Sequence, residues 1–83
     1  DINPQAPTHV LIVPKRHVVG VAELKKEDEN LAGRLIVQAK EIAKALGLTS
    51  YRLVFNQGRE AGQSVFHLHL HLLGGRPMKW PPG

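Results

Sequence analysis

Three histidines alternate with leucines near the end of this 83-residue chain, in the run His67-Leu68-His69-Leu70-His71-Leu72. Alternation with a period of two is typical of a β-strand, where successive side chains point to opposite faces of the sheet. We therefore predict a strand whose histidines line one face, about 6.6 Å apart at each step of two residues. The leucine face requires an apolar layer to cover it, whereas the histidine face can stay accessible.

A helix is predicted to provide that apolar layer. From about Glu27 onward, apolar residues recur at spacings of three and four, which places them along one side of a helix. Lys40 and Lys44 near the predicted end complement the helix dipole, and Gly47 is suited to end the helix in a left-handed conformation. The apolar stripe consists of Leu31, Leu35, Ala39, Ile42 and Leu46.

Two further segments are predicted to be strands of the same sheet. Residues 10–13 form a continuous apolar run that ends at Pro14, which is typical of a buried strand. Residues 51–56 alternate in the manner of a strand with one buried face, and residues 57–63 form a glycine-containing loop. The expected fold class is therefore α+β, with a half-covered antiparallel sheet packed against a long helix in one domain over residues 1–83.

Composition excludes several classes of function. The chain has no cysteine, which rules out disulfides and thiolate–metal sites and leaves oligomerisation as the usual support for so small a domain. No apolar run approaches the roughly 20 residues that cross a bilayer, and no secretory signal is visible, so we expect a cytoplasmic protein with no membrane partner. The net charge is +4, but the basic residues are scattered among only four aromatic residues. We expect no dedicated binding of nucleic acids.

The row of histidines suits chemistry at phosphorus. A neutral imidazole can attack phosphorus and form a transient phosphoramidate, which divides one displacement into two easier steps. Neighbouring imidazoles disfavour the charging of all three at once, so one can stay neutral as the nucleophile. Glycines in residues 57–63 can present backbone N–H groups to a phosphate. The three imidazoles are equivalent on this reasoning, and Ser64, at odd spacing from them, needs a bulge or bend to join them.

Two other interpretations of the row remain open from the residues alone. Two histidines that are two residues apart on a strand can bind zinc, with His9 or an acidic residue completing the site. No Asp or Glu, however, lies within six residues of the histidine row. The histidines can also be partly buried polar groups at a subunit contact. His17 belongs to no such pattern, and we interpret it as a surface histidine.

The row and its surroundings resemble the histidine triad (HIT) superfamily. Residues 67–73 match its signature His-φ-His-φ-His-φ-φ, in which φ is apolar, and His71 stands where the nucleotidyltransferase branch has glutamine. Segments similar to the Hint branch follow one another along the whole chain, at residues 1–9, 62–65, 73–76 and 80–83. The resemblance implies a HIT-like fold that lacks the segment which precedes Asp1 in other members.

The resemblance also implies an activity. Members of the Hint branch are homodimeric nucleotide-binding hydrolases that cleave the phosphorus–nitrogen bond of purine nucleoside phosphoramidates, such as AMP joined to an amine, without a cofactor or metal. By the motif, His69 is the nucleophile that becomes nucleotidylated and His71 contacts the phosphate. His67 and His9 support the imidazole network, and Ser64 lies near the phosphate and the leaving group.

Further positions are implied to bind the nucleotide or the partner subunit. Asp1 and Ile2 match positions that contact the ribose and base, and the tail around Trp80 resembles the segment that reaches the partner's site. Asn56 matches a position near the phosphate and the leaving group, and Gly62 and Gln63 are further positions expected to bind the nucleotide. The expected ligand is a purine nucleoside monophosphate or its amidates. The alternatives are a non-catalytic nucleotide-binding or scaffold protein and a histidine-based zinc protein.

Overall fold

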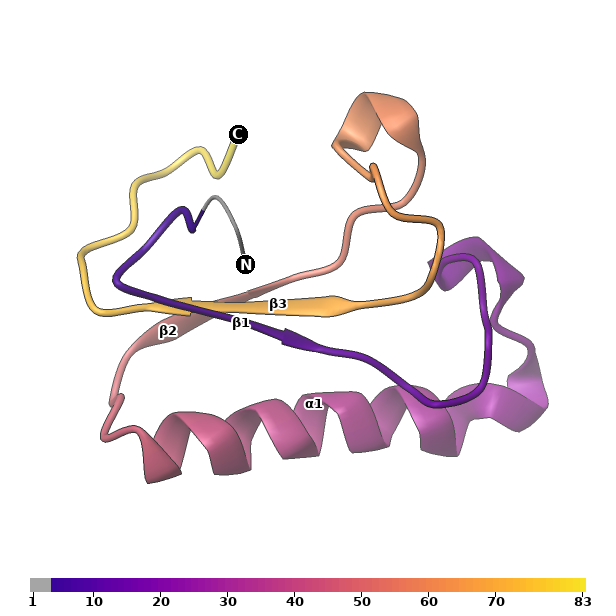
Figure 1. Ribbon diagram of the computed structural model, residues 1–83, viewed down its shortest axis with the longest axis horizontal. Coiled ribbons are helices and arrows are strands. Elements are labelled where there is room, and N and C mark those ends of the chain that lie inside the picture. The colour runs from indigo at the N-terminus through magenta and orange to yellow at the C-terminus, as the bar shows by residue number, and fades with distance from the viewer. Residues whose placement is uncertain (1–3) are drawn as a thin grey trace.

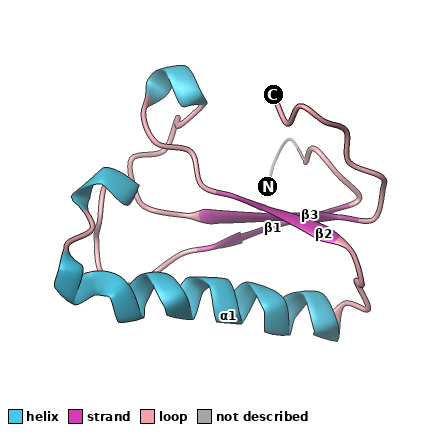
Figure 2. Cartoon of the chain, turned by 180° about the vertical axis from the view of Figure 1, so that it is seen from behind, coloured by secondary structure: helices cyan, strands magenta, loops and turns pink. Residues whose placement is uncertain are grey.

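A three-stranded antiparallel sheet lies on a long helix in residues 4–83, the part of the chain that the computed structural model describes. The helix α1 (Glu29–Ala45) packs along one face of the sheet. The C-terminal tail and the loop between β2 and β3 lie on the opposite side (Figure 1), as the view from behind in Figure 2 also shows. The strands are β1 (Thr8–Ile12), β2 (Tyr51–Val54) and β3 (Leu70–Gly74). The expected α+β class is confirmed.

The sheet places β3 at its centre. The strand order is β1-β3-β2, and β3 runs antiparallel to both neighbours. The register pairs Leu72 with Val10 on one side and with Leu53 on the other, so these three apolar side chains share the face that packs on α1. On the other face, His71 lies between Leu11 and Val54. The two faces therefore divide as the alternation predicts.

The core confirms the leucine face. Leu68, Leu70 and Leu72 are at most 2% exposed, and they pack with Leu35 and Ala39 of α1. The histidines of the row are half-buried on the opposite face. Burial of apolar side chains contributes about 25 cal/mol for each Å² removed from water, so this layer is the main source of stability.

The helix ends as predicted, but one residue of the predicted apolar stripe is not buried. Gly47 adopts a φ of 74°, and its N–H bonds to the carbonyl of Lys44 while the N–H of Leu48 bonds to that of Ala43. This pair of hydrogen bonds turns the chain sharply and packs Leu48, which is partly buried, against the core. Leu46, which was predicted to complete the stripe, is therefore left 54% exposed.

All three predicted strands differ from those observed, and β2 ends at Val54 although the alternation extends to residue 56. β3 begins at Leu70, so His67 and His69 precede the strand, although half-buried and buried residues alternate without a break from His67 to Gly74. Residues 10–13 are predicted to form a buried strand, but two of the four side chains are exposed. Leu11 is 41% exposed because it lies on the accessible face of β1, which forms one edge of the described sheet. Val13, just after the end of that strand, is 48% exposed.

Truncation of a core leucine tests this assignment of faces. Leu72→Ala is expected to lower the free energy of unfolding by about 2–5 kcal/mol, because it leaves a cavity between β3 and α1. The matched control Leu46→Ala is expected to change it by no more than about 0.5 kcal/mol, because that side chain is exposed. Urea unfolding measures both values, and equal losses in the two variants would contradict the assignment.

Candidate active site

A cleft of about 330 Å³ opens on the accessible face of the sheet. His9 of β1, His71 and Leu73 of β3, and Arg52 and Val54 of β2 all line it, because each lies on that face in the register of the sheet. The remaining lining residues come from the N-terminal segment, the loop after β2 and the C-terminal tail, and they are Gln5, Asn56, Arg76, Met78 and Pro82.

Hydrogen bonds fix the protons of His9 and His71. The backbone N–H of Gln5 donates to Nδ1 of His9 over 3.0 Å, so this nitrogen carries no proton. Neutral His9 therefore holds its proton on Nε2 and donates it to Nδ1 of His71, 2.9 Å away. Because Nδ1 of His71 accepts, neutral His71 carries its own proton on Nε2. The chain of donors leaves His71 able to donate one hydrogen bond to a ligand.

His69 carries its proton on the other ring nitrogen, Nδ1, in contrast to His9 and His71. Its Nδ1 lies 2.7 Å from the carbonyl oxygen of His67. A carbonyl oxygen can only accept, so Nδ1 of His69 carries the proton and Nε2 keeps its lone pair in the neutral ring. The ring of His69 lies edge-on to that of His71, with 4.8 Å between the centroids. A hydrogen-bond donor and a nucleophilic nitrogen thus lie on neighbouring imidazoles.

Burial keeps two of these rings neutral. Loss of contact with water lowers the pKa of His71 below its usual value of 6.5, and the nearby His69 and His9 lower it further. Burial also lowers the pKa of His9. Both shifts favour the neutral form at pH 7, which agrees with the direction of the hydrogen bonds.

The structure brings together part of the predicted site. His9, His71 and Asn56 line the cleft, and His69 contacts His71. Ser64 lies in the exposed loop before β3 and is not among the residues that line the cleft.

Other predicted positions lie at the margins or beyond the described part of the chain. Gly62 has a φ of 98°, a conformation that favours glycine, and a Cβ there would lie 3.7 Å from the amide nitrogen of Asn56. Trp80 is 82% exposed on the tail. Asp1 and Ile2 lie outside the described residues.

The side chain of Gln63, which is predicted to contact nucleotide, is buried and hydrogen-bonds to three backbone groups around it, so it acts as a brace between these segments. Its side chain is 3% exposed, and its Oε1 accepts the N–H of Gly58 at 2.9 Å. Its Nε2 donates to the carbonyls of Val19 and Val65 at 2.7 and 3.2 Å, and its own N–H bonds to the carbonyl of Gly58. The polar atoms of this side chain are therefore already engaged by the surrounding backbone, and its contact with nucleotide stays a prediction.

Two arginines at the cleft were missed from the sequence. Arg52 donates to the carbonyl of Lys79 at 2.9 Å and tethers the tail to β2. Arg76 donates to the carbonyl of Gln5 through Nε and Nη2, at 3.1 and 2.8 Å, and ties the tail to the N-terminal segment. The alternation in β2 is the one signal that could have shown Arg52, because it lies on the face opposite Leu53.

Within residues 4–83, no three His, Cys, Asp or Glu side chains gather in a way that could hold a metal ion. No helix among these residues is both long and apolar enough to pass through a membrane.

Comparison with known proteins gives the class to which this fold and site belong. The sequence profile of the HIT domain matches residues 1–78, and the chain belongs to the HIT domain family. A HIT-like protein of Synechocystis sp. is 55% identical over 84 residues, which span all of this chain and 74% of the relative.

Two solved structures extend the comparison. The crystal structure of a HIT family hydrolase from Legionella pneumophila is 52% identical, with a TM-score of 0.97 over all of this chain and 76% of that chain. A more distant structure, of a hypothetical histidine triad nucleotide-binding protein from Sulfolobus tokodaii, is 34% identical. Its TM-score is 0.73, over 88% of this chain and 50% of that chain.

The lowered pKa values predict loss of stability in acid. The unfolded chain takes up protons on His9 and His71 near pH 6.5, whereas the folded protein does so only at lower pH. The free energy of unfolding should therefore be independent of these residues well above pH 6.5 and fall as the pH drops below it. Urea unfolding across this range is expected to show a shallower dependence in His71→Gln than in the wild type. An unchanged dependence would contradict the assignment.

The role of Gln63 as a brace is tested by its removal. Gln63→Ala leaves the N–H of Gly58 and the carbonyl of Val19 without their partner, so we expect a loss of about 1–3 kcal/mol in the free energy of unfolding. Ser64→Ala, at the exposed neighbouring position, is the matched control and should change it by no more than about 0.5 kcal/mol. Thermal and urea unfolding of both variants measure the difference. Similar stabilities would show that the brace is dispensable.

Proposed function

We propose that this HIT protein hydrolyses the phosphorus–nitrogen bond of purine nucleoside phosphoramidates in two steps, with His69 as the nucleophile. The observation that carries the proposal is the 2.7 Å contact between Nδ1 of His69 and the carbonyl of His67. That hydrogen bond keeps the proton on Nδ1, so the lone pair of Nε2 is available to attack. The name of the Legionella relative, a HIT family hydrolase, supports the class of reaction.

In the first step, the lone pair of His69 Nε2 forms a bond to phosphorus while the bond from phosphorus to the amine nitrogen breaks. The electron pair of the broken bond leaves with nitrogen, which takes a proton from water and departs as a free amine. The nucleotidylated ring is positively charged, and its Nδ1–H strengthens its hydrogen bond to the carbonyl of His67. The carbonyl therefore stabilises the intermediate more than the resting ring.

In the second step, a water molecule attacks phosphorus and the Nε2–phosphorus bond breaks. The electron pair returns to His69, the oxygen of water stays on the nucleoside monophosphate, and its proton passes to solvent. His71 donates its Nε2–H to a phosphate oxygen in both steps, and the hydrogen bond from His9 holds it in that tautomer. His67 contributes through its backbone carbonyl.

The nucleotide is proposed to bind along the cleft. The positive charges of Arg52 and Arg76 at the cleft favour an anionic ligand, although their N–H groups also bond to backbone carbonyls. Asn56 is proposed to lie near the phosphate, with Gly62 and Ser64 on the adjoining loop. Asp1 and Ile2 are proposed to contact the ribose and base. The description of the Sulfolobus relative as nucleotide-binding supports this class of ligand.

The protein is proposed to form a homodimer. Trp80 is 82% exposed, which is unusual for so large an apolar side chain and fits a residue that reaches the partner subunit. The proposed role of Trp80 is to contact the substrate bound in the partner's site.

Turnover of an adenosine phosphoramidate with a fluorescent amine leaving group tests the proposal. Each assay contains a chelator, so that a metal-dependent reaction is suppressed. His69→Gly is expected to lower kcat by more than about 10³-fold, because the two-step route requires the nucleophile. Added imidazole is expected to restore part of the turnover by occupying the space of the missing ring.

The control for this experiment lies far from the cleft. No other described histidine can serve as the control, because each contacts another histidine of the site or its surroundings. Lys44→Ala, near the end of α1, is used instead and is expected to leave turnover unchanged. Chelator-resistant turnover that persists in folded His69→Gly without imidazole would contradict the proposal. Tight binding of AMP without turnover in the folded wild type would instead indicate a non-catalytic nucleotide-binding protein.

A further inference from the structure

His17 lies against the ring of His67, although no sequence pattern pairs the two residues. The ring centroids are 5.1 Å apart and the rings meet edge-to-face at 80°. His17 is exposed, as predicted for a surface histidine, but it covers one side of a half-buried member of the histidine row. Edge-to-face contact is a favoured arrangement of aromatic rings.

The segment that carries His17 holds His67 at further points. Nε2 of His67 donates to the carbonyl of Pro14 at 3.0 Å, and the N–H of Leu68 donates to the carbonyl of Val18 at 2.6 Å. Val18 is itself 3% exposed in the core. Residues 14–18 therefore hydrogen-bond both to the ring of His67 and to the backbone of the residue that follows it.

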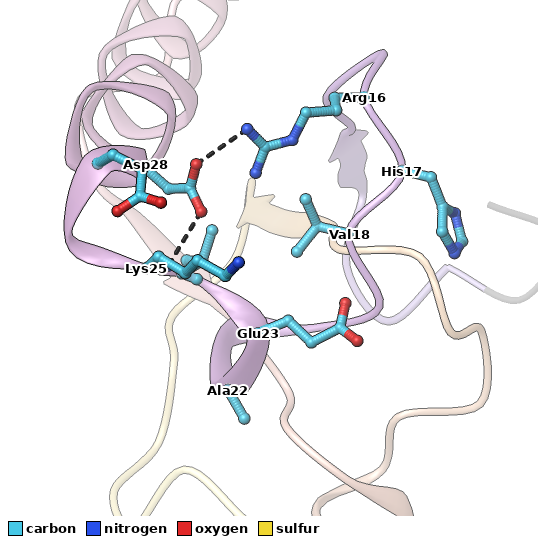
Figure 3. A pocket seen from close by; sticks show the side chains of 9 residues that line it. Arg16, His17, Val18, Ala22, Glu23, Lys25 and Asp28 are labelled. Carbon is cyan, nitrogen blue, oxygen red and sulfur yellow. Dashed lines mark hydrogen bonds and ion pairs between the residues drawn. The ribbon is translucent and has the colours of Figure 1, made fainter.

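An ion pair anchors this segment to the start of α1. Arg16 lies 2.9 Å from the carboxylate of Asp28, which is 6% exposed and also accepts the N–H of Lys25 at 2.9 Å. The hydrogen bond from Arg16 holds the pKa of Asp28 below its usual value, so the pair persists at neutral pH. Figure 3 shows Arg16 reaching Asp28 on one side of the segment, while His17 points to the other side.

The ion pair does not line the cleft. Arg16 and Asp28 line a separate pocket of about 720 Å³, and that pocket includes no member of the histidine row. The ion pair thus fixes the segment on the side away from the histidine row. The segment contacts the row through His67.

We infer that His17 is a positioning residue for the nucleophile. Its ring confines the ring of His67, and this confinement holds the carbonyl of His67 where it accepts Nδ1–H of His69. If His67 shifts, that acceptor shifts with it, and the proton of His69 is no longer confined to Nδ1. The effect on turnover rests on the proposed function, whereas the effect on the proton of His69 does not.

The inference assigns the role to the ring of His17 and not to its charge. A phenyl ring offers the same edge-to-face contact without a titratable group, so His17→Phe should preserve the arrangement. His17→Ala and His17→Gln remove the ring, and Gln keeps a polar side chain. Lys15→Ala, at another exposed position of the same segment, is the matched control.

The direct test is long-range ¹H–¹⁵N NMR of the imidazole nitrogens, which reports the tautomer of each neutral histidine. The wild type, His17→Phe and Lys15→Ala are expected to hold His69 in the Nδ1–H form. His17→Ala and His17→Gln are expected to show a mixture of tautomers at His69. An unchanged tautomer in both ring-removing variants would overturn the inference, whatever their activity.

Turnover of the adenosine phosphoramidate provides the second readout. In His17→Ala, kcat is expected to fall about tenfold with KM unchanged, because the nucleophile is less well aligned while the substrate is bound equally well. His17→Phe is expected to recover the wild-type kcat. Equal losses of kcat in the Ala and Phe variants would overturn the role of the ring. An altered tautomer in a protein that has no turnover would support the inference and contradict the proposed function.

Discussion

The burial of alternating leucines against α1 determines the face of the sheet on which the histidine row of this protein lies. Leu68, Leu70 and Leu72 are removed from water, and the period of the extended chain then directs the intervening histidines to the opposite face. A slip of one residue in the register of β3 would bury the imidazoles and expose the leucines. The apolar layer therefore secures the fold and the accessibility of the site at the same time.

The site depends next on backbone groups that set the position of protons. The N–H of Gln5 and the carbonyl of His67 act on different rings with opposite effects, since one is a donor and the other an acceptor. As a result, His71 can offer a proton while His69 can offer a lone pair, although the two side chains are chemically the same. The protein distinguishes its imidazoles by what the main chain presents to each of them.

Much of the fold follows from periodic patterns in the sequence. The alternation in the histidine row, the helical stripe and Gly47 each depend on local spacing, and the structure agrees with them. Leu46 was misplaced because the turn after α1 packs Leu48 against the core in its place. The burial of Leu11 and Val13 was overestimated because an apolar run alone does not show which face of a strand is covered.

The site was less predictable, because its details depend on contacts between distant segments. The sequence places His67, His69 and His71 on one face, but the proton of each ring is set by a partner that only the fold supplies. The side chain of Gln63 likewise bonds to Gly58, Val19 and Val65, and no local pattern in the sequence reveals these partners. His17 carries no signal of its own, since its partner lies 50 residues further along the chain.

The central claim is that His69, and no other imidazole of the row, forms the bond to phosphorus. Rapid acid-free quenching of the wild-type protein with an adenosine phosphoramidate, followed by fragmentation of the labelled peptide in a mass spectrometer, locates that bond. We expect an adenylyl group on His69 that accumulates before steady state and decays as the substrate is exhausted. An adenylyl group on His67 or His71, or steady turnover with no labelled peptide, would contradict it.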